Sequence, residues 1–120
     1  MKVIVFSILL LAVCSSASMQ PLDLTWISSD RVEVGWNAPR KLTSEFLVLW
    51  YCATKSRVMG STFVPRRATT YVAQVKFACP LITFNLYRFD WYYNQELYAA
   101  GSIRSYSISE KAGLELTDEP

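Results

Sequence analysis

The chain has 120 residues, of which 52% are apolar and 18% charged, with a formal net charge of +2 at pH 7. This length suits one domain, and the composition supplies enough apolar residues for a core. Histidine is absent, which removes the commonest general base and metal ligand and every Ser-His or Cys-His catalytic arrangement. We therefore expect no enzyme, no metal site and no cofactor, and the small net charge argues against a nucleic-acid partner.

The first segment has the layout of a secretory signal peptide. Met1-Lys2 precedes an apolar run from Val3 to Val13, and the small-residue stretch Cys14–Ser18 follows. This order predicts a signal peptide over residues 1–17, cleaved after Ala17 or Ser18, and a secreted, extracellular protein. A net charge near +1 would remain after cleavage.

Two alternatives for this segment remain open. A transmembrane anchor needs about 20 apolar residues, roughly twice the length of this run. A bacterial lipoprotein would be acylated at Cys14, but Val13 is larger than the residue usual at that position. Because the sequence has no later apolar run of sufficient length, we expect no membrane insertion after cleavage.

Two cysteines, Cys52 and Cys79, follow the signal segment. Exported chains mature in an oxidising compartment, so these residues are expected to form one disulfide, worth about 3 to 4 kcal/mol by the chain-entropy relation. The alternative is two separately buried thiols.

The remainder alternates between apolar and polar residues without helical periodicity, which is typical of an all-β chain. Seven short strands with short connections favour a two-sheet antiparallel sandwich. The predicted strands are Leu22–Ile27, Arg31–Trp36, Phe46–Ala53, Ser61–Pro65, Thr69–Ala78, Tyr87–Tyr93 and Ile103–Ser109. The acidic residues 111–120 are predicted to form a flexible tail.

Three motifs resemble the fibronectin type III family. The segment Val34-Gly35-Trp36-Asn37-Ala38-Pro39 is similar to the family's Val-x-Trp-x-x-Pro signature, and Phe46–Trp50 is similar to its aromatic-x-Val-x-aromatic strand. The segment Leu81–Trp91 resembles the region of the family that contains a tyrosine corner, although Thr83, Asn85 and Trp91 depart from the usual Pro, Thr and Val. The resemblance implies an immunoglobulin-like seven-stranded antiparallel β-sandwich over residues 18–110.

The expected core follows from this resemblance and from the odd-numbered aromatic residues of the Tyr87–Tyr93 strand. We expect Trp36, Tyr87, Phe89 and Trp91 to meet between the two sheets, with Tyr87 as the tyrosine corner. A true immunoglobulin domain is disfavoured because neither cysteine lies on the second or sixth strand. In the expected sandwich, the ends of the third and fifth strands lie at one pole, which agrees with a Cys52–Cys79 bridge.

The sequence offers two candidate binding surfaces. Leu97 and Tyr98 lie in the predicted loop 94–101, where exposed apolar side chains often mark recognition, although they could instead pad the edge of the sandwich. Basic residues between positions 40 and 76 form the second candidate, which could meet a glycosaminoglycan or an acidic protein, or simply be a solvated face. The basic residues of this span are Arg40, Lys41, Lys55, Arg57, Arg66, Arg67 and Lys76, of which Lys55, Arg57, Arg66 and Arg67 form the candidate patch.

These expectations together describe a secreted, monomeric, extracellular protein-binding module without catalytic activity. The alternatives are a structural, matrix or adhesion component, a glycosaminoglycan-binding secreted effector, or a receptor fragment. The sequence does not name the partner.

Overall fold

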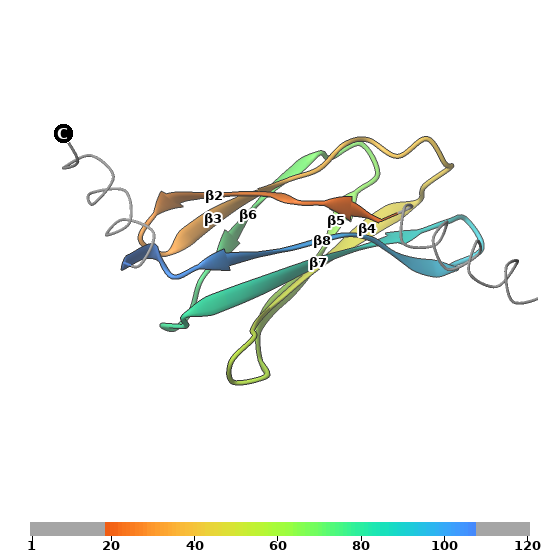
Figure 1. The fold of residues 1–120 in the computed structure, drawn as a ribbon. Coiled ribbons are helices and arrows are strands. Elements are labelled where there is room, and N and C mark those ends of the chain that lie inside the picture. Colours follow the sequence, from red (N-terminus) through yellow and green to blue (C-terminus); the bar gives the residue numbers. More distant parts are fainter. Residues whose placement is uncertain (1–18, 108–120) are drawn as a thin grey trace, which may run out of the picture.

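The computed structural model describes residues 19–107, so the predicted signal peptide and the predicted acidic tail lie outside the described residues. The described chain is all-β and forms two facing sheets (Figure 1). No helix in this part of the chain is long and apolar enough to span a bilayer. The strands are β1 (Gln20–Pro21), β2 (Asp23–Ser28), β3 (Arg31–Gly35), β4 (Glu45–Cys52), β5 (Arg57–Pro65), β6 (Thr70–Gln74), β7 (Leu81–Phe89) and β8 (Gln95–Arg104).

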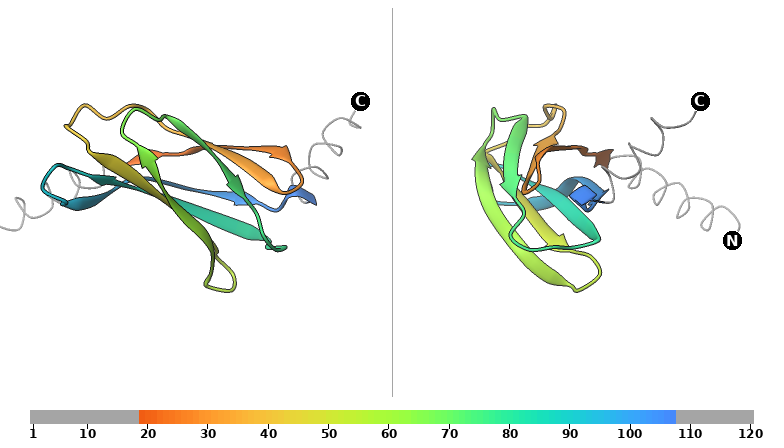
Figure 2. Two further views of the ribbon diagram at one scale, coloured as in Figure 1. Left: turned by 180° about the vertical axis from the view of Figure 1, so that it is seen from behind. Right: turned by 90° about the vertical axis from the view of Figure 1, so that its left-hand side faces the viewer.

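One sheet has five strands in the order β1-β8-β7-β4-β5, and the other has three in the order β2-β3-β6. Neighbouring strands are antiparallel except for the short β1, which pairs parallel with β8. Figure 2 shows the two sheets stacked as a sandwich from behind and from one end. The predicted fold class is therefore confirmed, with β1 as a short eighth strand added to the expected seven.

The observed strand bounds agree best with the predicted ones in the first half of the chain. The observed β2, β3 and β4 lie within a residue of the predicted bounds. The last two strands differ most, because β7 begins at Leu81 and β8 at Gln95, six and eight residues before the predicted starts. The turn between them consequently lies at residues 90–94, and the predicted loop 94–101 is almost entirely strand β8.

The core lies between the sheets and is formed by alternate residues of each strand. In β4 the even-numbered residues are buried and the odd-numbered ones are half-buried, as a strand with one face toward a core requires. Trp36 is 7% exposed and its ring lies 5.6 Å from that of Phe46. The largest fully buried side chains are Phe46, Phe84, Ile82, Leu86, Val32, Val34 and Val48, together with Cys52.

Cys52 and Cys79 form the predicted disulfide, with their Cα atoms 5.8 Å apart. Cys52 is the last residue of β4, and Cys79 lies two residues before β7. The bond therefore closes one end of the five-stranded sheet, which we call the disulfide pole. The opposite end carries the loops 36–44 and 66–69 and the turn 90–94, and we call it the aromatic pole.

The prediction that Tyr87, Phe89 and Trp91 fill the core is wrong. On β7 the buried residues are even-numbered, from Ile82 to Arg88, so Tyr87 and Phe89 are half-buried on the outer face. Trp91 lies beyond the strand and is 53% exposed. The cause is that the predicted strand began at Tyr87, which left out the inward-facing Ile82, Phe84 and Leu86 and gave the inward face only the charged Arg88. Of the four predicted core residues, Trp36 alone is in the core.

The predicted tyrosine corner is also not formed by Tyr87. Its hydroxyl accepts a hydrogen bond of 3.4 Å from the side-chain amide of Asn85, a neighbour on the same outer face. A corner tyrosine instead sends its hydroxyl to backbone upstream of its strand. The crossing between the sheets is held by other contacts, such as the bond of 3.0 Å that the Trp50 indole donates to the Gln74 carbonyl.

A β-bulge in β8 fixes the direction of the side chains near the aromatic pole. Leu86 pairs with Ala99 and Tyr87 with Leu97, so Tyr98 is the extra residue on β8. Such a bulge resets the alternation of a strand. Tyr98 and Ala99 are therefore both buried although they are consecutive.

Candidate functional site

Three consecutive aromatic residues occupy the turn between β7 and β8 at the aromatic pole. Trp91, Tyr92 and Tyr93 are 53%, 86% and 79% exposed. Adjacent large aromatic side chains that are this exposed are unusual on a chain that buries most of its apolar residues. We call residues 91–93 the aromatic turn.

Asp90 holds the backbone of the aromatic turn. One carboxylate oxygen accepts hydrogen bonds from the backbone N–H groups of Tyr92 (2.8 Å) and Asn94 (2.9 Å). The other accepts from the Asn94 side-chain amide at 3.0 Å. The backbone N–H of Asp90 donates to the Asn94 carbonyl, and that of Tyr93 donates to the Asp90 carbonyl, each at 3.1 Å. Five hydrogen bonds thus close a turn of five residues, so the rings project from a defined backbone.

These contacts also affect the ionisation of Asp90. The hydrogen bond from the Asn94 backbone, followed by that from its side chain, holds the pKa of the Asp90 carboxyl below its ordinary value, and the Tyr92 N–H and the Arg88 charge add to the effect. The carboxylate is therefore the form that stabilises the turn.

Ser44 attaches the turn to the loop before β4. Its hydroxyl donates to the carbonyls of Phe89 (3.2 Å) and Asp90 (3.0 Å), and its N–H donates to the Phe89 carbonyl at 2.8 Å. Tyr93 has a φ of 64°, in the left-handed region that residues with a side chain rarely adopt. The surrounding hydrogen bonds hold this conformation, which is common at binding sites.

An apolar row on the outer face of the five-stranded sheet continues the exposed aromatic surface. Register pairs Leu97 of β8 with Tyr87, Tyr87 with Leu47 of β4, and Leu47 with Phe63 of β5. Phe63 is 58% and Leu97 40% exposed. We call these four residues the outer row. The Phe63 ring lies 5.9 Å from that of Phe89, the last residue of β7, so the row borders the aromatic pole.

Comparisons with known proteins identify the architecture. Among solved structures, the chain is similar to a fibronectin type III domain of human collagen XX (residues 368–466), with a TM-score of 0.60 and 11% identity over 72% of this chain and 88% of that one. It is also similar to a segment of two fibronectin type III domains from chicken tenascin, with a TM-score of 0.60 and 16% identity over 72% of this chain and 50% of that one. The chain has the fibronectin type III fold. No family model and no curated protein matches its sequence.

The fibronectin type III fold separates the two halves of the predicted basic patch. Lys55 and Arg57 lie at the β4–β5 hairpin of the disulfide pole, whereas Arg66 and Arg67 follow the far end of β5. The nine residues of β5 place these pairs roughly 30 Å apart. The Arg66 guanidinium lies 5.5 Å from the centre of the Trp91 ring, a cation–π distance that makes Arg66 a neighbour of the aromatic turn.

The two residues predicted to touch a partner have different positions. Leu97 is exposed on the outer row, where it can contact another molecule. Tyr98 is 9% exposed, and its hydroxyl donates a hydrogen bond of 2.9 Å to the Asn37 carbonyl. The placement of Tyr98 at an exposed loop tip is thus wrong, because the bulge turns it inward.

The inner side of the aromatic pole contains an ion pair between a buried arginine and a partly exposed glutamate. Arg88, 6% exposed, donates from Nε to a Glu96 carboxylate oxygen at 2.7 Å and from Nη1 to the Leu42 carbonyl at 2.7 Å. Glu96 also lies 3.7 Å from the Lys41 ammonium. These contacts satisfy a charge inside the sandwich and fix the loop 36–44 against β7 and β8. Within residues 19–107, no group of three or more His, Cys, Asp or Glu side chains is placed to hold a metal ion.

Sequence reasoning missed the aromatic turn because it assigned residues 91–93 to a strand, with Trp91 and Tyr93 on the face toward the core. A signal for the turn is present, since Asp90 and Asn94 flank the three aromatic residues. Asp and Asn are turn formers that bond to nearby backbone, and they would have divided the apolar stretch at this point.

Proposed function

We propose that this protein is a secreted, non-catalytic module that binds another protein through the aromatic turn and the adjoining outer row. The observation that carries the proposal is the exposure of Trp91, Tyr92 and Tyr93 on a turn fixed by Asp90. Tyr and Trp supply large contact area at a low cost in side-chain entropy, and they are enriched among residues that dominate binding energy. A preformed turn also avoids ordering a loop on binding.

Leu97 belongs to this proposed contact surface, as a member of the outer row. The row is half-buried in its middle, at Leu47 and Tyr87, and open at its ends. The ring of Phe63 lies 5.9 Å from that of Phe89, which precedes the turn, so one partner could cover the row and the turn together. Exposed apolar surface of this kind marks interaction sites on soluble proteins.

The test compares proteins captured from extracellular fluid by the immobilised chain and by a Tyr92→Ser/Tyr93→Ser variant. Both rings are exposed, so the variant is expected to keep its fold, which its thermal unfolding curve would verify. A Lys55→Gln/Lys76→Gln variant, altered at the disulfide pole, serves as the matched control. We expect the wild type and the control to retain the same proteins and the tyrosine variant to lose them. Equal capture by all three would contradict a role for the turn.

Secretion is supported by the disulfide, which persists in oxidising compartments. Expression of the full chain in a secreting cell should release a product into the medium that begins after Ala17 or Ser18. Mass spectrometry of the intact product measures the cleavage site. Recovery of the uncleaved chain inside the cell would contradict this part of the proposal.

A structural or matrix role predicts a different outcome of the capture experiment. If the chain is a passive matrix component, the wild type and the Tyr92→Ser/Tyr93→Ser variant should capture the same proteins or none. The separation of the two basic pairs favours a protein partner over a glycosaminoglycan that would contact Lys55, Arg57, Arg66 and Arg67 together.

A further inference from the structure

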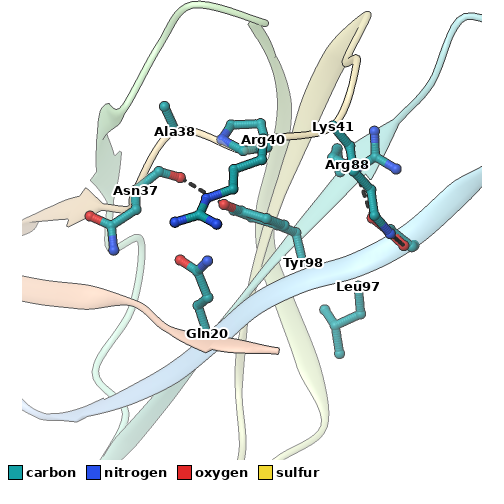
Figure 3. Close-up of a pocket in the computed structure, with 10 residues that line it drawn as sticks. Gln20, Asn37, Ala38, Arg40, Lys41, Arg88, Leu97 and Tyr98 are labelled. Carbon is teal, nitrogen blue, oxygen red and sulfur yellow. Dashed lines mark hydrogen bonds and ion pairs between the residues drawn. The ribbon is translucent and has the colours of Figure 1, made fainter. Parts of the chain in front are cut away.

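A polar cavity of about 450 Å³ opens at the aromatic pole, between the loop 36–44 and strands β1 and β8 (Figure 3). Arg88 and Tyr98, both buried, contribute to its lining, and their hydrogen bonds to Leu42, Glu96 and Asn37 fix this region of the structure. The cavity is therefore built from positioned side chains.

The charges that line this cavity do not balance. Arg40, Lys41 and Arg88 contribute three positive charges, against the single carboxylate of Glu96. Glu96 is already bonded to Arg88 at 2.7 Å and lies 3.7 Å from Lys41. Among the ion pairs of the described chain none involves Arg40, whose side chain is exposed. Figure 3 shows the Arg40 side chain among the residues that line the cavity. The site consequently favours an anion.

Gln20 supplies a second, independent observation. Its Oε1 is shielded from solvent and has no hydrogen-bond partner among the described residues. A buried acceptor without a donor is uncommon and costs stability, so rotation of the Gln20 side chain toward an N–H donor bound in the cavity would remove that cost. A ligand that fits this cavity therefore combines an anion, for Arg40 and Lys41, with a nearby N–H donor.

We propose that this cavity receives an aspartate or glutamate side chain of a partner protein, with Arg40 and Lys41 binding the carboxylate and Gln20 accepting a hydrogen bond from the adjoining peptide N–H. An acidic residue within a peptide carries both groups a short distance apart. Guanidinium–carboxylate bonds are strong and directional, which suits a specific contact. This inference deepens the proposed function, on which it rests, because Leu97 lines the cavity and also belongs to the outer row.

The test is an NMR titration of the 15N-labelled chain with N-acetyl-glutamic acid N-methylamide, and with its uncharged glutamine counterpart as the matched probe. The acidic probe should cause saturable shifts in the amides of residues 37–41 and 96–98, with a dissociation constant on the order of millimolar, as expected for so small a ligand. An Arg40→Gln/Lys41→Gln variant should weaken binding at least tenfold. Both residues are exposed, so the fold should be retained. The Lys55→Gln/Lys76→Gln variant should bind as the wild type does.

Three results would overturn the proposal: equal shifts with the glutamine probe, unchanged binding by the Arg40→Gln/Lys41→Gln variant, or saturation by glucosamine 6-sulfate with no response to the acidic probe. The last result would assign the cavity to a sulfated glycan. Titration of the Tyr92→Ser/Tyr93→Ser variant separates this inference from the proposed function. If that variant still binds the acidic probe and captures the same proteins as the wild type, the cavity assignment stands. The role of the aromatic turn would then be contradicted.

Discussion

The two poles of the sandwich are held closed by different chemistry. At the disulfide pole, one covalent bond ties the end of β4 to the segment before β7, so the connection does not depend on the nearby side chains. At the aromatic pole, the segment before β4 is tied to the end of β7 by hydrogen bonds from Ser44 to the Phe89 and Asp90 carbonyls and from Arg88 to the Leu42 carbonyl. The Asp90 carboxylate closes the turn from β7 to β8. The aromatic pole thus uses its polar side chains for structure, while Trp91, Tyr92 and Tyr93 remain exposed to solvent.

Removing the disulfide should have the largest effect on stability. A Cys52→Ala/Cys79→Ala variant is expected to lose about 3 to 4 kcal/mol of unfolding free energy, because the unfolded chain regains the freedom of the closed loop. Urea unfolding at equilibrium measures the loss. The amide shifts of residues 90–94 should stay unchanged, and a change there would contradict the independence of the two poles.

Breaking the ion pair between Arg88 and Glu96 should have the next largest effect and should act on the aromatic pole. A Glu96→Ala substitution leaves the Arg88 guanidinium buried without its carboxylate partner. The expected loss of unfolding free energy is about 2 to 3 kcal/mol, somewhat below the usual range for a buried pair because Glu96 is partly exposed. Glu96→Gln is the control, since its amide oxygen can still accept from Arg88. Equal losses from both variants would show that the charge of Glu96 is unimportant.

Removal of the Tyr98 hydroxyl tests a single hydrogen bond between β8 and the loop after β3. Tyr98→Phe removes its bond to the Asn37 carbonyl and keeps the ring in the core. We expect a loss of about 1 kcal/mol, the usual net value for one such bond. Tyr92→Phe, at an exposed position, should change stability by less than about 0.5 kcal/mol. The same thermal or urea unfolding experiment distinguishes the two, and equal effects would contradict the buried position of Tyr98.

The smallest expected effect is the pH dependence of the aromatic turn. Because the folded pKa of Asp90 is depressed below the ordinary value of 3.8, its stabilising contribution is fully present above that value. The contribution is lost as the pH falls through the lower folded pKa. The amide shifts of Tyr92 and Asn94 should therefore stay constant from pH 7 to about pH 4 and change only below it. An Asp90→Asn variant should lack this transition, and a transition between pH 5 and 7 in the wild type would contradict the assignment.

The sequence predicted the first half of the fold well because those strands have one clearly apolar face. On β3, Val32 and Val34 alternate with charged or small residues, so the sequence identified which residues face the core. The disulfide was predicted from cysteine number and compartment alone, and its position agreed with the fold that the motifs implied.

In the second half of the chain, the inward faces of β7 and β8 were not predicted because they depend on contacts between strands. Arg88 occupies an inward position on β7, where pattern reading assigns a charged residue to solvent, and Glu96 and the Leu42 carbonyl compensate its burial only through the folded structure. The bulge at Tyr98 then shifts the alternation of β8 by one residue. Both features depend on contacts across strands, so the inward faces of β7 and β8 could not be predicted from local sequence, whereas the turn has a local signal in Asp90 and Asn94.

The left-handed backbone at Tyr93 has a consequence for engineering. A φ of 64° suits glycine, and holding a side-chain-bearing residue there costs roughly 1 to 2 kcal/mol. Tyr93→Gly should consequently relax the turn and raise the melting temperature while deleting one of its exposed rings. A screen for high melting temperature alone would thus select variants that lack the Tyr93 ring. Engineering of this domain would therefore have to select for melting temperature and for ligand binding at the same time.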